Sequence, residues 1–213
     1  GGTTNGNGGT VNIIAGNNVS ITGAASNIDV SPAGANGNGG TVNITASNSS
    51  GTGALTLSTN INAAGTGVGN GGTVRLTNNS SQTLLVNQPI SVAAGTTGNG
   101  GQIFIKNYGN GAANGGIDVQ TILTANASGN GNGGTVSLDA CPPAGVAGNV
   151  NIGVTPFSAN GAGVGNGGLV QIKGAQIIDS AASAITLTAN AGTVGSGGTV
   201  ELAAKAATGD ISF

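Results

Sequence analysis

The chain has 213 residues, of which 44 are Gly and one is Cys, and it contains no His, Met or Trp. With only six acids and four scattered cations, its formal net charge is −2 and it offers no basic stripe, so we expect no nucleic-acid partner. No apolar run approaches the roughly 20 residues that cross a bilayer, which predicts no membrane span.

A four-residue motif, Gly-Asn-Gly-Gly, divides the chain into seven units. It begins at Gly6, Gly37, Gly69, Gly98, Gly131 and Gly165, and it returns as Gly-Ser-Gly-Gly at Gly195. Its last glycine moves from Gly9 to Gly198 in six steps, a mean period of about 31 residues. Such a period, varying by a few residues, is typical of a solenoid whose strands keep their register while its loops differ in length.

An alternating strand follows each motif, starting with the run from Thr10 to Ile14. Its second and fourth positions are always Val, Ile or Leu, and successive side chains of a strand point to opposite faces. We therefore expect two aliphatic columns in the interior. Their members are Val11/Ile13, Val42/Ile44, Val74/Leu76, Ile103/Ile105, Val136/Leu138, Val170/Ile172 and Val200/Leu202.

Two shorter apolar segments complete each unit. They are 19–21 with 28–30, 55–57 with 61–63, 84–86 with 90–92, 117–119 with Ile122, 150–152 with Phe157, and Ile177 with 185–187. Three strands per unit predict an all-β fold, a right-handed parallel β-helix (β-solenoid) of about seven coils with a roughly triangular cross-section. We expect one solenoid domain over residues 1–213, with no cap recognised at either end.

The motif itself predicts a sharp corner. Glycine enters the left-handed region of backbone conformation without penalty and asparagine tolerates it, so we attribute the corner to positive φ angles. Stacking should place the motif asparagines above one another, and we expect their amides to form a hydrogen-bonded ladder and not a ligand site. These residues are Asn7, Asn38, Asn70, Asn99, Asn132 and Asn166.

The stretch from Gly37 to Ala64 reads GNGGTVNITASNSSGTGALTLSTNINAA, and variants of it fill essentially the whole chain. This pattern resembles the shaft repeats of filamentous haemagglutinin-like exoproteins, which bacteria secrete by the two-partner route. It is similar in particular to the versions found in cyanobacteria and related bacteria. The resemblance implies a right-handed β-helix that is exported across the outer membrane and acts as an adhesin or a surface fibre.

The acids are too dispersed for catalysis by a β-helical lyase or hydrolase, which gathers carboxylates and cations on one face. Asp29 and Asp118 lie in different strands three coils apart. The outward column that contains Lys106, Asp139 and Lys173 is interpreted as a surface charge ladder. No corner carries the Asp that binds calcium in glycine-rich nonapeptide repeats. We therefore expect no catalytic, cofactor-binding or metal-binding residue, no cofactor and no enzymatic activity.

The favoured function is an extracellular or cell-surface structural fibre or adhesin shaft. Its coils are expected to continue end to end into a filament, either within a longer polypeptide or by head-to-tail stacking on another copy of the chain. The alternative is a module that binds a carbohydrate or a surface at Phe104, Tyr108 and the loop from Asn107 to Gly115. A partial threonine column makes an ice-binding face a weaker alternative. Cys141 is interpreted as a small apolar or turn residue, with intermolecular pairing or thiol reactivity as the other readings.

Overall fold

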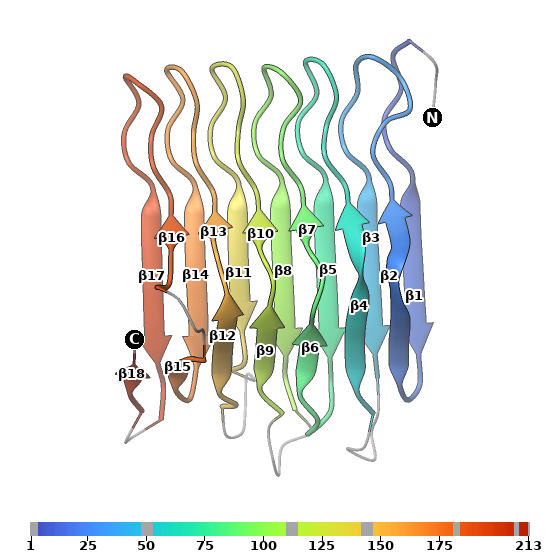
Figure 1. Cartoon of the computed structure of the whole chain (residues 1–213), viewed down its shortest axis with the longest axis vertical. Helices are drawn as coiled ribbons and strands as arrows, with labels where there is room; N and C mark the ends of the chain where they lie inside the picture. Colours follow the sequence, from blue (N-terminus) through green and yellow to red (C-terminus); the bar gives the residue numbers. More distant parts are fainter. Residues whose placement is uncertain are drawn as a thin grey trace.

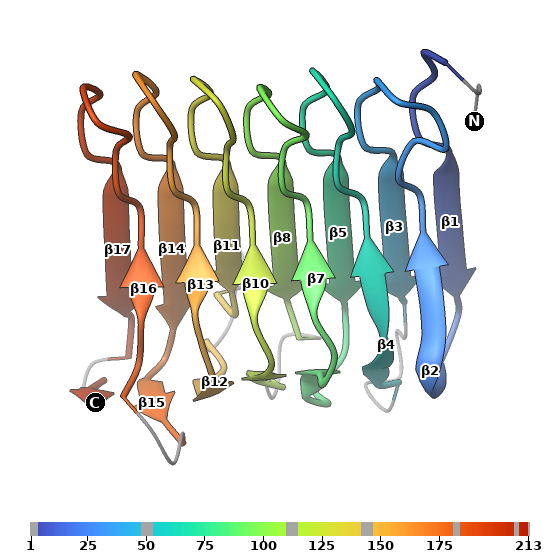
Figure 2. The same cartoon turned by 45° about the horizontal axis from the view of Figure 1, so that its top comes forward.

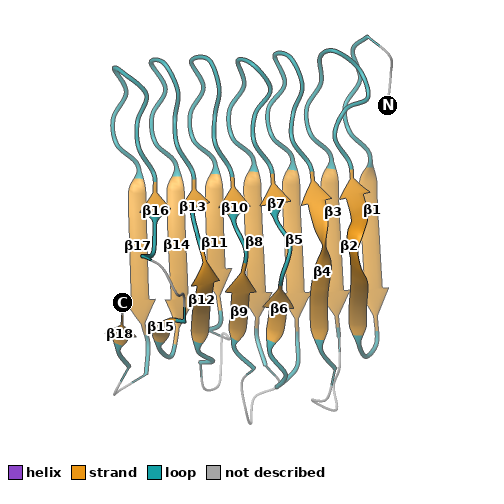
Figure 3. Cartoon of the chain, viewed as in Figure 1, coloured by secondary structure: helices purple, strands orange, loops and turns teal. Residues whose placement is uncertain are grey.

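The structure, a computed structural model, describes residues 4–47, 53–109, 115–141, 147–180, 184–206 and 209–212. Figure 3 shows these residues as strands and loops, without a helix among them. The strands stack in parallel into a β-solenoid, which confirms the expected fold class.

The first sheet takes one strand from each of the seven coils. Its strands, in spatial order, are β1 (Thr10–Ala15), β3 (Thr41–Ala46), β5 (Thr73–Asn78), β8 (Gln102–Asn107), β11 (Thr135–Asp139), β14 (Leu169–Gly174) and β17 (Thr199–Ala204). All neighbours are parallel and pair equivalent positions of the repeat, as in Thr10 with Thr41 and Val11 with Val42. The motif therefore sets the register of the whole sheet.

The second sheet contains the remaining strands. They are β2 (Val19–Asp29), β4 (Leu55–Asn62), β6 (Leu84–Val86), β7 (Ile90–Ser91), β9 (Ile117–Gln120), β10 (Leu123–Thr124), β12 (Val150–Val154), β13 (Phe157–Ser158), β15 (Ile177–Asp179), β16 (Leu187–Thr188) and β18 (Ile211–Ser212). Figure 2 shows β9 and β12 foreshortened while β10 and β13 are seen along their length. This sheet therefore bends between the row of second strands, which includes β9 and β12, and the row of third strands, which includes β10 and β13.

Three strands per coil occur in the four coils that begin with β5, β8, β11 and β14. In the first two coils the second and third strands instead form one long strand, because alternation continues without a break from Leu55 to Asn62. Pro89 and Pro156 lie in two of the later breaks, where a missing N–H interrupts the strand ladder.

The winding is right-handed. In Figure 1 the chain descends along the fainter, more distant first sheet, climbs along the second sheet in front, and advances from right to left. The direction of rotation and the direction of advance therefore match those of a right-handed screw, as the sequence predicts.

The two aliphatic columns of the first sheet lie in the core. In the five inner coils every member is fully buried, from Val42 and Ile44 to Val170 and Ile172. In the outermost strands the same positions are only half-buried, and Val200 is 43 % exposed. The columns thus run through the molecule and end at its two terminal coils.

Two assignments in the third strand need correction. Ile122 is 37 % exposed, and its neighbour Leu123 is the buried residue, paired with Ile90 and Phe157. In the sixth coil the strand comprises Leu187–Thr188, and Leu187 pairs with Phe157. The alternation in fact continues without a break from Ile117 to Leu123, with the polar Thr121 at an inward position, so the apolar Ile122 faces outward.

The explanation for the motif glycines is also wrong. Among the described residues positive φ angles fall on other glycines, such as Gly67, Gly129 and Gly163, two residues before a motif. The motif glycines are required because neighbouring backbones approach closely. A Cβ on Gly100 would overlap the carbonyl oxygen of Ala125 and lie 2.6 Å from the nitrogen of Gly134 in the next coil.

A backbone hydrogen bond closes each corner within its own coil. The last motif glycine donates its N–H to the residue that ends the third strand, as in Gly101 to Val92 at 2.8 Å and Gly168 to Ala159 at 2.7 Å. We call these corners, residues 31–40, 64–72, 93–101, 126–134, 160–168 and 190–198, the glycine edge. It forms the top of Figure 1, and the connections from the first to the second strands form the variable edge at the bottom.

The asparagine ladder exists, with a different partner from the one expected. Each side-chain Oδ1 accepts the backbone N–H of the equivalent residue in the following coil, at 2.7–3.0 Å. The steps run from Asn7 through Asn38, Asn70, Asn99, Asn132 and Asn166 to Ser196. The ladder therefore ties one coil to the next along the glycine edge, in agreement with a structural role.

Candidate functional site

The outer face of the first sheet carries three columns of side chains, whose register is fixed by the strand pairing. The central column runs Asn12, Asn43, Arg75, Phe104, Ser137, Gln171 and Glu201. The columns on either side contain most of the outward threonines and the predicted row of Lys106, Asp139 and Lys173. This face gathers three of the four cations of the chain.

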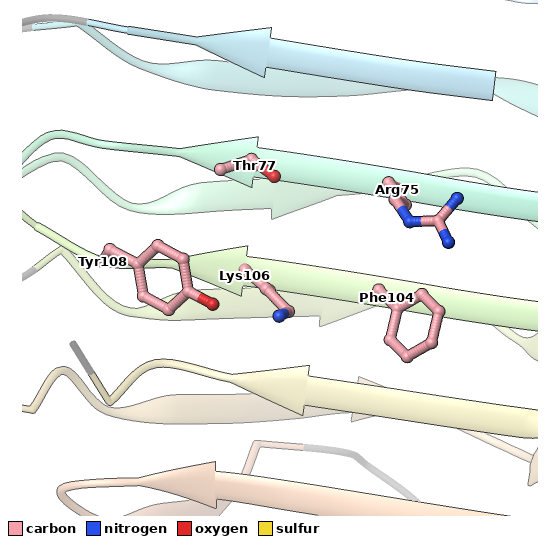
Figure 4. A pocket seen from close by; sticks show the side chains of 5 residues that line it. All are labelled: Arg75, Thr77, Phe104, Lys106 and Tyr108. Atoms are coloured by element: carbon pink, nitrogen blue, oxygen red, sulfur yellow. The ribbon is translucent and has the colours of Figure 1, made fainter. Parts of the chain in front are cut away.

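A shallow pocket of about 330 Å³ lies on this face over β5 and β8. Figure 4 shows the five residues that line it, Arg75, Thr77, Phe104, Lys106 and Tyr108. Arg75 is exposed and the other four side chains are half-buried. The predicted binding residues Phe104 and Tyr108 are thus placed in one pocket, while residues 110–114 of the predicted loop lie outside the described residues.

Each cation of the pocket lies over an aromatic ring. The guanidinium carbon of Arg75 is 5.3 Å from the centre of the Phe104 ring, across two adjacent coils. The ammonium of Lys106 is 5.6 Å from the centre of the ring of Tyr108, which follows β8 and lies two residues further along the chain. Both distances are in the range of cation–π attraction, which holds the two cations above the sheet.

Buried asparagines fix the backbone that carries Tyr108. Asn107 is fully buried, and its Nδ2 donates to the carbonyl oxygens of Gln82 and Gly116, each at 2.8 Å. Asn78, one coil earlier, also donates to Gln82 and accepts the N–H of Tyr108 at its own carbonyl, at 2.9 Å. These bonds join both ends of the connection between β8 and β9, so the position of Tyr108 is supported from inside the solenoid.

The charge column beside the pocket is not a continuous chain of ion pairs. Within the described part of the chain the one ion pair joins Lys173 Nζ to Glu201 Oε1, at 3.6 Å. Asp139, between Lys106 and Lys173 in register, accepts the backbone N–H of Cys141 at 3.0 Å. The two cations of the pocket therefore remain without a carboxylate partner among the described residues.

Three groups have a shifted pKa. A hydrogen bond from Gln171, together with the charge of Lys173, lowers the pKa of the Glu201 carboxyl. The hydroxyl of Ser31 lowers the pKa of Asp29. Partial burial, reinforced by the charge of Asp139, raises the pKa of the Cys141 thiol, which keeps that thiol protonated and poorly nucleophilic at neutral pH.

The acids do not assemble into a centre. Asp29 binds Ser31 and Asn62, and Asp118 accepts a hydrogen bond from Gln120 at 2.6 Å in a different row of the second sheet. Among the described residues no three His, Cys, Asp or Glu side chains group as ligands for a metal ion. The threonine column is interrupted by Gln102 and Leu169 in register.

Arg75 and Thr77 are the pocket residues that the sequence reasoning did not assign. The spacing of the repeat already places Arg75 opposite Phe104 and Thr77 opposite Lys106, and the strand pairing shows this register. The alignment of the coils therefore already places these residues next to one another. That they line a pocket follows only from the stacking of the side chains, which the structure shows.

Comparisons of the chain with protein-family models, with curated proteins and with solved structures found no match. No helix in the described residues is long and apolar enough to cross a membrane. The function is therefore argued from the geometry of the solenoid.

Proposed function

We propose that this chain forms an extracellular structural or adhesive shaft, in which solenoid coils continue end to end, within a longer polypeptide or from one copy into the next. The observation that carries this proposal is that the aliphatic columns reach both terminal coils and become exposed there. Val11 and Ile13 at one end and Val200 and Leu202 at the other lie in strands that pair on one side only.

A further coil would cover these apolar side chains and pair the open strand edges. Burying an aliphatic side chain stabilises by about 1.5–3 kcal/mol, and each open edge offers a row of unpaired N–H and C=O groups. The two ends belong to one repeating pattern, since β1 and β17 carry the same motif in the same register. A contact between unlike ends does not close on itself and therefore generates a fibre.

The resemblance to the shaft repeats of filamentous haemagglutinin-like exoproteins supports the location and the adhesive role in this proposal. A surface with few charges and many Asn, Ser and Thr side chains also suits a passive shaft. Stability along the axis comes from backbone hydrogen bonds and stacked apolar columns, which need no metal and no disulfide.

The proposal is tested at Gly197, where a built Cβ has nothing within 4 Å. At the equivalent Gly167 a Cβ would overlap the carbonyl oxygen of Ala189 and the next coil. If a second copy continues the stack, the nitrogen of its Gly9 takes the place that the nitrogen of Gly198 has beside Gly167, and a Cβ at Gly197 would overlap it. Gly197→Ala should therefore fold like the original chain and fail to form rods longer than the roughly 35 Å of one solenoid.

Sedimentation and negative-stain electron microscopy over a range of concentrations would measure this assembly. Val194→Ala is the matched control, because Val194 is on the same corner, is 77 % exposed and already has a Cβ. Rods of Gly197→Ala as long as those of the control would contradict the proposed joint. An original chain that stays monomeric at every concentration would contradict head-to-tail stacking of copies.

A further inference from the structure

The pocket over β5 and β8 differs from the rest of the first sheet in chemistry. It combines two cations, two aromatic rings and two hydroxyl groups within adjacent coils. The equivalent strand positions of the other coils carry Asn, Ser, Thr, Gln, two acids, one Lys and two aliphatic residues, and no aromatic ring. A solenoid needs none of these side chains on its outer face. We propose that this pocket binds an acidic polysaccharide, through a carboxylate on the sugar and the ring of the same unit.

The charges of the pocket select an anion. Arg75 and Lys106 project on adjacent coils and offset strand positions, so their Cα atoms are about 8 Å apart. Neither cation forms an ion pair in the described part of the chain. The guanidinium of Arg75 presents two parallel N–H donors that match the two oxygens of a carboxylate. Its contact with the Phe104 ring orients these donors before a ligand arrives.

The rings and hydroxyls select a sugar. A sugar ring has a face of C–H bonds, which packs against the electron-rich surface of an aromatic side chain, and hydroxyls around its rim. Phe104 and Tyr108 supply aromatic surface, and Thr77 and the Tyr108 hydroxyl supply donors and acceptors. In Figure 4 the Tyr108 hydroxyl points toward Lys106, whereas the Arg75 guanidinium lies over Phe104 at the other end of the pocket.

Other anionic partners would contact fewer of the cations, rings and hydroxyl groups of the pocket. A nucleic acid is bound by neutralising many phosphates, and two cations in a chain of net charge −2 are too few. A carboxylate on a flexible peptide could meet Arg75 and Lys106, but it would leave the rings and hydroxyls unused. The shallow, open shape also suits one stretch of a chain that crosses the sheet.

Tyr108 makes the site directly observable, because it is the only tyrosine and the chain has no tryptophan. Titration of the chain with hexagalacturonate should change the tyrosine emission in a saturable way, whereas neutral maltohexaose should give no saturable change. Because the proposed contact includes the sugar ring, a hexaglutamate peptide should bind at least about tenfold more weakly than hexagalacturonate.

Two double variants with the same loss of charge separate the pocket from general electrostatics. Arg75→Gln with Lys106→Gln should weaken hexagalacturonate binding about tenfold or more, while Lys173→Gln with Lys205→Gln should change it less than about twofold. Phe104→Leu, which keeps Tyr108 as the reporter, should weaken binding several-fold. Thermal unfolding would verify that each variant is folded. If the pocket double variant does not fold, Arg75→Gln and Lys106→Gln would be measured separately.

Equal losses in the two double variants would overturn the site, because general charge attraction would then explain the binding. Equal affinity for hexaglutamate would overturn the sugar class, and equal affinity for maltohexaose would overturn the role of the carboxylate. The absence of any saturable response would overturn the proposal entirely. None of these results bears on end-to-end assembly, which is measured separately.

Discussion

The two edges of the solenoid contrast sharply. On the glycine edge, nine residues lead from the end of the third strand to the last motif glycine in five coils, from Ala63 to Gly72 through Ala189 to Gly198. On the variable edge, the connection from the first to the second strand ranges from two residues after β14 to ten after β11. Both edges turn the same chain around the same core.

The difference between the two edges shows where the fold restricts loop length and side-chain size and where it tolerates changes in them. The glycine edge is held by contacts between backbones of adjacent coils, so side-chain volume cannot increase at the motif glycines without shifting several coils. Its length varies by only one residue, in the corner from Val30 to Gly40. The variable edge lacks that stack of identical corners. The one pocket residue outside a strand, Tyr108, begins a variable connection, as expected where loops carry function on a rigid scaffold.

The largest expected effect tests the close approach on the glycine edge. Gly100→Ala should destabilise the chain by about 3 kcal/mol or more, because its Cβ would overlap backbone atoms that cannot move independently. Gly197→Ala, at the same motif position in the last coil, should cost less than about 1 kcal/mol. Chemical unfolding of the two variants measures this difference, and equal losses would show that backbone conformation, not contact, requires glycine.

On the variable edge, the next largest effect is expected at Asn107. Replacing this buried side chain by alanine removes three hydrogen bonds, to Gln82, Gly116 and Gly109, and should lower the free energy of unfolding by about 2–3 kcal/mol. The emission of Tyr108 should change as well, since its backbone support is lost. Asn149→Ala, an exposed position on the same edge, is the control and should stay within about 0.5 kcal/mol.

A smaller effect is expected for one step of the asparagine ladder. Asn99→Ala leaves the N–H of Asn132 without its 2.7 Å acceptor, which should cost about 1 kcal/mol because water can reach this exposed corner. Asn99→Asp keeps an acceptor oxygen and should retain most of the stability. If the two variants unfold alike, the ladder is not what stabilises the corner.

The smallest effect concerns pH. The folded-state pKa values of Asp29 and Glu201 are lowered, so their stabilising contribution is complete above the unfolded values near about 4 and is lost as the pH falls through the folded values. With only six acids in the chain, the unfolding temperature should be nearly constant from pH 7 to 5 and fall slightly below about pH 4. Calorimetry that showed a steep loss near pH 6 would contradict this account.

Much of the fold follows from the sequence because the motif fixes the register. Once Gly40, Gly72 and Gly101 are aligned, the pairing of Arg75 with Phe104 and the buried columns follow directly. The reason for the glycines does not follow, because a clash between Gly100 and Ala125 exists only after the coils are stacked. For the same reason, the asparagine amides were expected to bond one another and instead reach the backbone of the next coil.

The short third strands and the site were harder to predict. Ile122 and Leu123 are adjacent and equally apolar, and the polar Thr121 at the inward position before them hides the alternation that buries Leu123. The sequence indicated Phe104 and Tyr108 as the place for a ligand, but stacking of the cations on the rings depends on side-chain directions that spacing leaves open.

The most direct test of the shaft is a cryo-electron microscopy map of the assembled chain at the joint between two copies. The account predicts that β17 of one copy pairs in parallel with β1 of the next, about 4.8 Å away, with the glycine edges aligned. It also predicts that Val200 and the next copy's Val11 lie in one continuous buried column. Separate solenoids whose terminal strands stay unpaired, or copies that associate side by side, would contradict it.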